Sequence, residues 1–500
     1  MNNEANGNGV AENVTVMSGS AARTGIWYVL FVALCLRLVL PLWGLLYTHD
    51  AKTFSSVDTW SFVVPAQELI SHHRFFTHGA PEIIRTPGYP LLLTVGLLAG
   101  QLELVTLLLQ ILISCFTVYM VYQTAHVLFE REIIAIVAAA LYTVEPLSIR
   151  YSSTLVTETL FSALAIVWLY FLLKYLDCHQ LRDLLLSGVV LAASVYVRPV
   201  GYFLPVVIAT GLTVWVLVTT DRKIHFITHI AVFLAVSMSL TGAWQARNQL
   251  ETGYSGFSAI SSINMYYYLA TSVLAAQQQV PFFEMQRRLG YRAKMQDRFG
   301  YLDDRIYFER HPEQRTWTLA ERLNYMSREG EHILLRHPLS YLRIHIEGIV
   351  RSVFDPSATG LLKFFRLIPD EDRVFGKLVD GGIVRTMKEL RLTSPLIFWA
   401  NALLLLVQLL YLSFASFALV SRRLIRQPKV IAAIFVVAYY LVIAGGPAAN
   451  SRFRHPAMPI ICVLAGYGVC EVWNRLLLWF KWRISVGDNE ASVESEAASA

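Results

Sequence analysis

The chain has 500 residues, of which 55% are hydrophobic and only 16% are charged, with a formal net charge of +6 and a mean hydropathy of +0.47. Soluble globular domains carry about 25% charged residues, so this composition excludes an ordinary soluble protein. The basic residues are spread over short loops and form no single stripe. This distribution argues against a nucleic-acid partner and favours membrane topology as the source of the positive charge.

The apolar residues come in continuous blocks and do not alternate with polar ones. About 20 residues of helix cross the hydrocarbon core of a bilayer, and lipid cannot satisfy unpaired backbone groups, so helices are the expected spanning elements. The sequence therefore predicts an all-α polytopic membrane protein. The eleven apolar blocks lie at 26–48, 87–100, 104–129, 133–149, 155–176, 184–197, 202–219, 224–244, 395–420, 430–445 and 459–480.

Charge placement orients these blocks, because Lys and Arg in short loops mark the cytoplasmic side. Basic residues lie in the loops at 174–182, 222–223, 422–429 and 481–483. This predicts that both termini are cytoplasmic and that the two long gaps between blocks face the outside. Both long gaps can face the outside only if the block at 87–100 does not cross the membrane. This block has only about 14 residues against the roughly 20 needed, so we expect it to be an interfacial or half-membrane helix. About ten spans then remain, in the plasma (inner) membrane.

The polar ends of the chain and its two long gaps divide it into parts. The ends are rich in small and polar residues, which predicts disorder. We expect a disordered cytoplasmic N-terminus at 1–25, a transmembrane bundle at 26–246 that includes a first outer loop at 49–86, an outer region at 247–394, C-terminal transmembrane helices at 395–482, and a disordered cytoplasmic tail at 483–500.

The outer region at 247–394 is too long for a plain loop within a compact fold. Within it, residues 328–351 show apolar residues at helical spacing, broken at Pro338. This pattern predicts amphipathic helices that lie on the membrane surface.

The first outer loop contains an acidic residue, Asp58, with an aromatic residue four positions later at Phe62 and a small residue four further on at Ala66. It enters the next apolar block through Arg-Thr-Pro-Gly-Tyr-Pro at 85–90. This arrangement resembles the GT-C class of membrane glycosyltransferases, whose relatives include the protein O-mannosyltransferases and the lipid A aminoarabinose transferase. The chain departs from several relatives at Thr59, where they carry a second acidic residue, and at Phe62, where Tyr is common. Further likenesses lie at 146–158, 197–201, 247–248 and 452–459.

The resemblance implies a GT-C-like bundle with outer interfacial helices. It also implies an enzyme that moves a hexose or pentose from a polyprenyl-phosphate donor in the bilayer to a hydroxyl of a lipid, glycan or protein acceptor in the cell envelope. Such a transfer needs a carboxylate to take the acceptor proton and cations to neutralise the leaving phosphate. Asp58 is the candidate base, and a single carboxylate that deprotonates the acceptor inverts the anomeric centre. The alternative is that Asp58 only caps a helix.

Six further residues are candidates for binding the substrates. Arginine suits a phosphate because its planar fork is always charged, although arginines at helix ends also serve as interface anchors. A carboxylate at a helix start is favoured by the helix dipole in any case, so Glu158 also has a structural interpretation. The six are Glu82, Arg85, Glu158, Arg198, Arg452 and Arg454.

Two alternatives remain open at this point. The histidines of the first loop could bind a divalent metal, but the loop lacks an HExxH motif or fixed ligand spacing, so we expect no metal and no cofactor. A transporter or flippase of an envelope intermediate would place paired charges at mid-helix, and Arg37 is the main such charge. The residues of the metal alternative are His49, His72, His73 and His78 with Asp50, Asp58 and Glu82.

Overall fold

The computed structural model describes residues 19–48, 51–219, 221–291, 304–369 and 374–499. In these residues the protein is helical almost throughout, which confirms the all-α polytopic fold class. Strand structure among them is a two-residue hairpin in the first loop, where β1 (Phe76–Thr77) pairs with β2 (Ala80–Pro81) in antiparallel register. Residues 1–18, which make up most of the N-terminal part for which we expect disorder, lie outside the described residues.

Seven helices of the described chain are long and apolar enough to cross a membrane. Their continuous apolar surfaces fit lipid on one side and the bundle core on the other, as spanning helices require. They contain α1 (Gly19–Trp43) with the π-helical turn η1 (Gly44–Thr48), α4 (Leu102–Phe129), α7 (Glu158–Cys178), η3 (Pro199–Gly201) with α9 (Leu204–Thr219), α10 (Lys223–Thr252), α19 (Pro395–Val420), and α21 (Ser451–Arg454) with η7 (His455–Ala457) and α22 (Met458–Ser499).

A bent pair, α5 (Glu132–Thr143) and α6 (Pro146–Ser152), makes an eighth span if it is counted as one, with a bend of 59°. The bend leaves carbonyl groups without helical partners, and the fully buried Arg37 of α1 fills this gap. Its guanidinium donates to the carbonyls of Tyr142 at 3.4 Å and Thr143 at 3.2 Å. It also reaches the hydroxyls of Ser114 on α4 and Ser148 on α6, at 2.6 Å and 3.3 Å. Arg37 therefore fastens the first helix to the bend.

Three apolar helices are shorter than a typical span. Two of them, α8 (Leu181–Val197) and α20 (Pro428–Ile443), have 17 and 16 residues, which is about 25 Å of helix against about 30 Å of hydrocarbon. The expected count of about ten spans includes these two. The third, α3 (Gly88–Leu98), has 11 residues. Its length of about 17 Å is too short to cross the hydrocarbon core, and its half-membrane placement stays a prediction.

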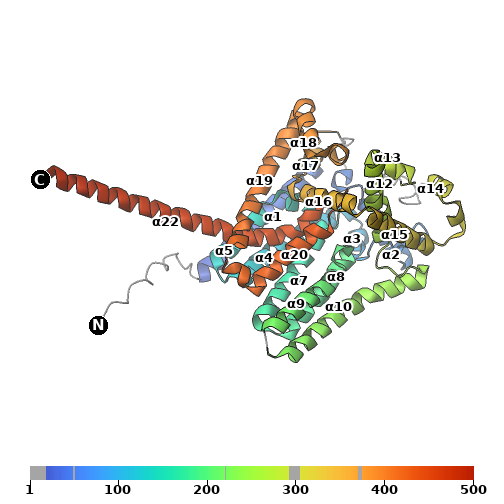
Figure 1. Ribbon diagram of the computed structural model, residues 1–500, viewed down its shortest axis with the longest axis horizontal. Helices are drawn as coiled ribbons and strands as arrows, with labels where there is room; N and C mark the ends of the chain where they lie inside the picture. Colours follow the sequence, from blue (N-terminus) through green and yellow to red (C-terminus); the bar gives the residue numbers. More distant parts are fainter. Residues whose placement is uncertain (1–18, 49–50, 220, 292–303, 370–373, 500) are drawn as a thin grey trace.

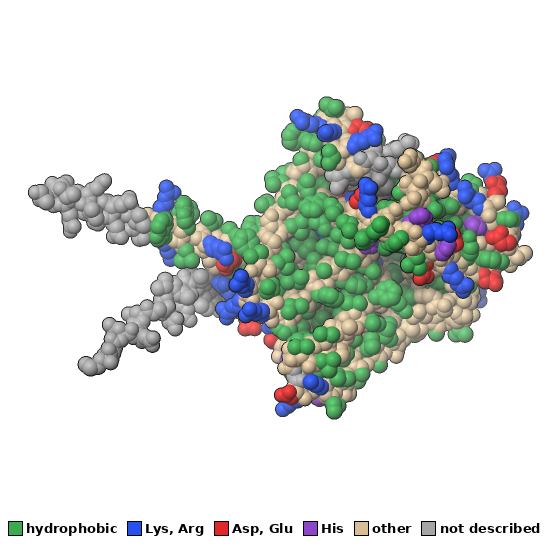
Figure 2. Space-filling model, viewed as in Figure 1, with side chains coloured by type: hydrophobic (Ala, Val, Ile, Leu, Met, Phe, Trp, Pro, Cys, Tyr) green, Lys and Arg blue, Asp and Glu red, His purple; other side chains and the backbone are tan. Residues whose placement is uncertain are grey.

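The two ends of the bundle differ in composition. At one end, Lys429 at the start of α20 lies 2.9 Å from Asp177 in α7 and 3.3 Å from Glu130 after α4. The start of α1 and the far end of α22 lie on this side (Figure 1). The outer region lies at the other end, and a broad band of hydrophobic side chains separates the two sets of charges (Figure 2). The remaining elements of the bundle are η2 (Ala51–Phe54), α2 (Thr59–His72) and η6 (Leu424–Arg426).

The long region after α10 folds into helices around a small core that is rich in tyrosine. Its predicted break at Pro338 is confirmed, because α15 ends at Arg336 and α16 begins at Pro338. The side chains of Leu339 and Leu342 on α16 are exposed, as expected for an amphipathic helix at a membrane surface. The elements are α11 (Ile260–Ile263), η4 (Asn264–Ala270), α12 (Thr271–Gln278), α13 (Phe282–Arg288), α14 (Asp304–Arg310), η5 (Pro312–Thr316), α15 (Leu319–Arg336), α16 (Pro338–Phe354), α17 (Ala358–Phe364) and α18 (Val374–Thr393).

The C-terminal tail differs from its expected disorder. The helix α22 continues without interruption to Ser499 and extends away from the bundle (Figure 1). The tail is rich in Ala and Glu, which have high helix propensity. The polar tail can therefore continue a helix that begins in the membrane-spanning part of α22.

Candidate active site

Asp58 occupies the N-cap position of α2, yet its side chain makes no capping hydrogen bond. Its carboxylate instead accepts from two guanidiniums. Oδ1 lies 2.8 Å from Nη2 of Arg85, and Oδ2 pairs with Nη1 of Arg452. The position agrees with the helix-cap interpretation, whereas the contacts place the carboxylate in a charged site.

The residues that follow Asp58 at fourfold spacing hold α2 against the bundle. Phe62 and Ala66 are buried on one face of the helix, as positions four residues apart must be. Phe62 packs edge-on against Tyr89, with ring centroids 5.3 Å apart. The guanidinium of Arg85 lies 4.6 Å from the Phe62 ring centroid, a cation–π contact. The motif of the first loop therefore positions both Asp58 and its partner Arg85.

Glu82 organises the loop just before Arg85. One carboxylate oxygen accepts from the backbone amides of Ile84 and Arg85, at 2.6 Å and 2.7 Å. The other accepts from the hydroxyl of Thr77 at 2.5 Å. Glu82 is buried and both of its oxygens are engaged within its own loop. The structure therefore places it as a support for Arg85, and it does not reach the carboxylate of Asp58.

Arg452 joins the first loop to a second carboxylate. While Nη1 pairs with Asp58, Nε pairs with Oε1 of Glu158 at the first position of α7. Glu158 has no exposed side-chain area, and the same oxygen accepts from Nη1 of Arg198 at 2.8 Å. The result is a continuous chain of alternating charges. In order it runs Arg85, Asp58, Arg452, Glu158, Arg198.

The charge chain contains three guanidiniums and two carboxylates, so it carries one excess positive charge. Burial raises the pKa of Asp58, but the guanidiniums of Arg452 and Arg85 outweigh burial and hold that pKa well below its usual range. Asp58 is therefore ionised at neutral pH. Its side chain is 27% exposed whereas that of Glu158 is fully buried, so Asp58 is the carboxylate of the chain that a substrate can reach.

Arg454 lies two residues from Arg452 but serves a different purpose. Its Nη1 donates to the carbonyls of Ser352, Val353 and Asp355, at 2.7, 2.9 and 3.0 Å. These carbonyls end α16, where the helix leaves backbone acceptors unsatisfied and a positive charge is favourable. The expectation that Arg454 binds a substrate is thus not supported by its contacts, which are those of a helix C-cap.

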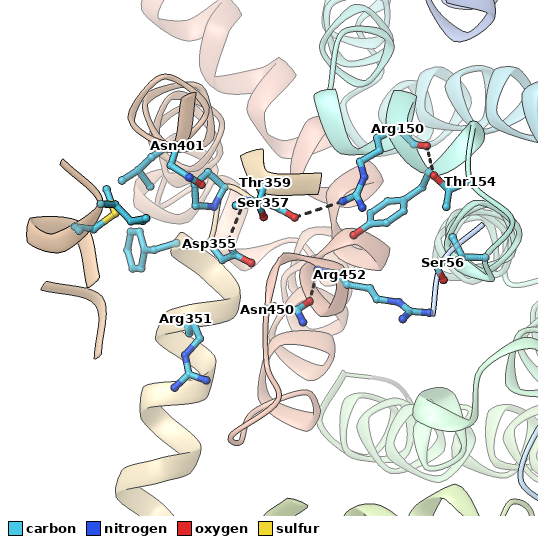
Figure 3. A pocket seen from close by; sticks show the side chains of 17 residues that line it. Ser56, Arg150, Thr154, Arg351, Asp355, Ser357, Thr359, Asn401, Asn450 and Arg452 are labelled. Carbon is cyan, nitrogen blue, oxygen red and sulfur yellow. Dashed lines mark hydrogen bonds between the residues drawn. The ribbon is translucent and has the colours of Figure 1, made fainter. Parts of the chain in front are cut away.

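A cavity of about 310 Å³ adjoins the charge chain at Arg452. It lies between α6, the end of α16, α17, α18 and α19 (Figure 3). Arg150, Arg351 and Asp355 line it together with Arg452. Arg150, Arg351 and Asp355 were not among the site residues predicted from the sequence. Arg150 sits among the ionisable residues at the same end of the bundle as Asp58, and that clustering was the available signal.

Residues 85–246 match the family described as dolichyl-phosphate-mannose-protein mannosyltransferase. The match begins at Arg85 and includes Glu158 and Arg198. No curated protein sequence matches the chain. Over 93% of this chain, the fold is similar to that of the oligosaccharyltransferase AglB from the archaeon Archaeoglobus fulgidus, in a complex with an inhibitory peptide and a dolichol-phosphate, with 14% identity and a TM-score of 0.50. The family match covers 162 of the 500 residues, so it concerns this segment of the chain.

A second structure of the same archaeal enzyme, tethered with an acceptor peptide, covers 92% of this chain with 12% identity and a TM-score of 0.51. The chain covers 52% and 51% of those two chains. It therefore spans about half the length of the solved structures it matches. At this identity the likeness concerns the fold.

The later motifs of the GT-C resemblance have structural explanations. Arg247 donates to the carbonyls of Phe75 and Glu82, both at 2.8 Å, and so ties the end of α10 to the first loop. Asn248 donates to the carbonyls of Gly256 and Phe257 at 3.0 and 3.1 Å. Both residues thus build the junction on which the first loop rests.

Among the described residues, the histidines of the first loop do not converge on a carboxylate cluster. The structure shows no group of three or more His, Cys, Asp or Glu that could hold a metal within the residues it describes. His72 lies 3.0 Å from Glu68 one turn earlier. His73 and His78 each have a left-handed backbone conformation at a turn. His49 and Asp50 of the metal alternative lie outside the described residues.

Proposed function

We propose that this protein transfers a sugar from a polyprenyl-phosphate donor to the hydroxyl of an envelope acceptor, with inversion at the anomeric carbon. The observation that carries the proposal is the charge chain. Its partly exposed carboxylate, Asp58, pairs with Arg452, and Arg452 also lines a cavity that contains two further arginines. Base and counter-charge are the two groups that such a transfer requires. The dolichyl-phosphate family match over 85–246 supports a lipid-linked donor.

The proton of the acceptor hydroxyl passes to Asp58 in this proposal. The acceptor oxygen forms its bond to the anomeric carbon as the bond from that carbon to the phosphate oxygen breaks. Glu158 is fully buried and engaged by Arg198 and Arg452, so Asp58 is the accessible one of the two carboxylates in the charge chain. A single displacement follows, which inverts the anomeric centre.

Arg452 has a second part in this reaction because it borders both the cavity and Asp58. In the arrangement described above, its charge helps to hold the pKa of Asp58 low, which makes Asp58 a weak base. A phosphate in the cavity competes for the same guanidinium. When Arg452 turns toward that phosphate, the pKa of Asp58 rises toward its usual value. Donor binding and base activation are thereby coupled.

The orientation of the enzyme follows from the two ends of the bundle. Lys429 and the other basic residues of the short loops lie at the end opposite Asp58, and such loops face the cytoplasm. We therefore place the termini inside the plasma (inner) membrane and the active site on its outer face, with the donor reaching the cavity from the bilayer. Arg37, on which a transport function would depend, is occupied by carbonyls and hydroxyls of its neighbours, which favours transfer over transport.

Replacement of Asp58 by Asn tests the proposal. The asparagine keeps the shape of the side chain but cannot accept the proton, so we expect the rate of transfer to fall by about 10²- to 10⁴-fold. The assay follows transfer from the polyprenyl-phosphate sugar that mass spectrometry identifies in the purified protein. Asp177→Asn, at the other end of the bundle, is the matched control and should keep wild-type activity.

Gel filtration and thermal unfolding in detergent establish that both variants fold. A folded Asp58→Asn protein with wild-type transfer would overturn the proposed base. A purified protein that carries only bulk phospholipid, with no sugar transfer from any polyprenyl-phosphate donor, would overturn the proposed function as a whole.

A further inference from the structure

Arg150 is the arginine of the cavity with the weakest set of partners among the described residues. Its Nη1 lies 3.5 Å from the hydroxyl of Ser357, and it forms no ion pair with a carboxylate in the part of the chain that the structure describes. By contrast, Arg351 donates to the carbonyl of Pro447 at 2.6 Å, and Arg452 binds two carboxylates. A partly buried guanidinium without a counter-charge favours an anionic ligand.

The carboxylate of the cavity does not neutralise Arg150. Oδ1 of Asp355 accepts from the backbone amide of Ser357, and Oδ2 accepts from that of Ser451, both at 2.9 Å. These bonds hold the chain after α16 to the start of α21, and Asp355 forms no ion pair with Arg150 in the described structure, although both line the cavity (Figure 3). The positive charge of Arg150 is therefore available to a ligand in the cavity.

Gly360 in α17 provides the space that the guanidinium occupies. A Cβ atom added at this position would lie 2.2 Å from Cζ and Nη1 of Arg150, far inside van der Waals contact. Gly360 has no strained backbone conformation that would itself call for glycine. A side chain at this position would therefore force the guanidinium of Arg150 to move from its place against α17.

The part of the cavity wall formed by α18 and α19 is mostly apolar, with Asn401 as its polar residue. Met387 and Leu390 of α18 and Leu405 of α19 line the cavity, and α19 is one of the helices long enough to cross the membrane. A ligand that fits this cavity combines a negative head with an apolar chain that continues along α19. The volume of about 310 Å³ lies at the lower end of the range for small-molecule pockets, about 300–1,000 Å³.

We infer that Arg150, in the space left by Gly360, binds the phosphate of an isoprenoid phosphate whose chain lies against α18 and α19. This inference rests on the proposed function and names the residue that recognises its donor. The guanidinium fork suits two phosphate oxygens at once. Arg452, which lines the same cavity, then faces the sugar end of the phosphate, next to Asp58.

Ligand binding to the purified full-length protein tests the inference without any transfer reaction. Geranylgeranyl phosphate is the probe, geranylgeraniol lacks the phosphate, and inorganic phosphate lacks the chain. We expect Arg150→Gln to weaken the binding of geranylgeranyl phosphate by at least about tenfold, as the loss of a hydrogen bond to a charged group does. Binding of geranylgeraniol should be unchanged. The matched control is Arg343→Gln, which removes an exposed arginine on α16.

Gly360→Ala provides a second variant that retains the arginine. Its new methyl group displaces the guanidinium, so we expect geranylgeranyl phosphate to bind more weakly here too, with the melting temperature of the ligand-free protein showing that it folds. Wild-type affinity for geranylgeranyl phosphate in both variants would overturn the inference. The proposed function would still stand in that case if sugar transfer is lost in Asp58→Asn. Equal binding of phosphatidylglycerol would also overturn it, because the site would then recognise a bulk lipid headgroup.

Discussion

The two ends of the helix bundle hold ion pairs of different kinds. At the Asp58 end, Glu158 has no exposed side-chain area and shares one oxygen between two arginines. At the opposite end, Lys429 pairs with Glu130 and Asp177, whose side chains are 78% and 48% exposed. Exposed pairs contribute little to stability, whereas a buried pair becomes costly as soon as one partner is removed. The difference predicts that the same kind of substitution has unequal effects at the two ends.

The largest effect is expected for Glu158→Gln. The substitution leaves Arg198 and Arg452 buried with one carboxylate fewer, which should lower the free energy of unfolding by about 3–5 kcal/mol. Glu130→Gln at the other end is the matched control, with an expected loss of at most about 1 kcal/mol. Unfolding of both proteins in detergent, followed by circular dichroism, gives the two values. Equal losses would show that burial does not distinguish the two ends.

A smaller effect is expected from pH. Because the pKa of Asp58 is lower in the folded protein than in the unfolded chain, its ion pairs stabilise the fold fully above the unfolded pKa of about 4. That stabilisation is lost as the pH falls from about 4 through the lowered pKa of the folded state. The free energy of unfolding should therefore fall more steeply with acid in the wild type than in Asp58→Asn. Parallel curves between about pH 5 and pH 2 would contradict the lowered pKa.

The smallest effect is expected for Lys429→Met. The ion pairs of Lys429 are exposed on their acidic side, so the free energy of unfolding should fall by only about 0.2–1 kcal/mol. Salt screens such pairs, and the difference from the wild type should shrink further in high salt. A loss as large as that of Glu158→Gln would mean that the two ends are held together in the same way.

Local spacing was enough to predict part of the site. Asp58, Phe62 and Ala66 follow each other at fourfold intervals, and such residues share a helix face whatever the rest of the chain does. Likewise, the short block at 87–100 forms the short helix α3. Both predictions depend on residues that are close in sequence.

Contacts between distant segments could not be predicted in this way. Arg452 reaches Asp58 across 394 positions, and only the packed bundle brings them together. Arg452 and Arg454 share the same short helix, α21, but they point to different neighbours, so one joins the charge chain and the other caps α16. Likewise, Glu82 is a candidate substrate ligand in the sequence, and only the structure shows that its carboxylate accepts from the backbone amide of Arg85.

Arg37 has a consequence for how the protein is made. Its hydroxyl partner on α6, Ser148, follows it by 111 positions, so α1 meets the membrane well before its partners have been synthesised. An arginine near the centre of an isolated spanning helix costs about 2.5–3.5 kcal/mol on insertion. The first helix therefore enters the bilayer with an uncompensated charge. Arg37 forms its hydrogen bonds only after α4, α5 and α6 have been inserted. The order of synthesis thus sets the order of assembly, and α1 is fully anchored only after the bend between α5 and α6 has formed.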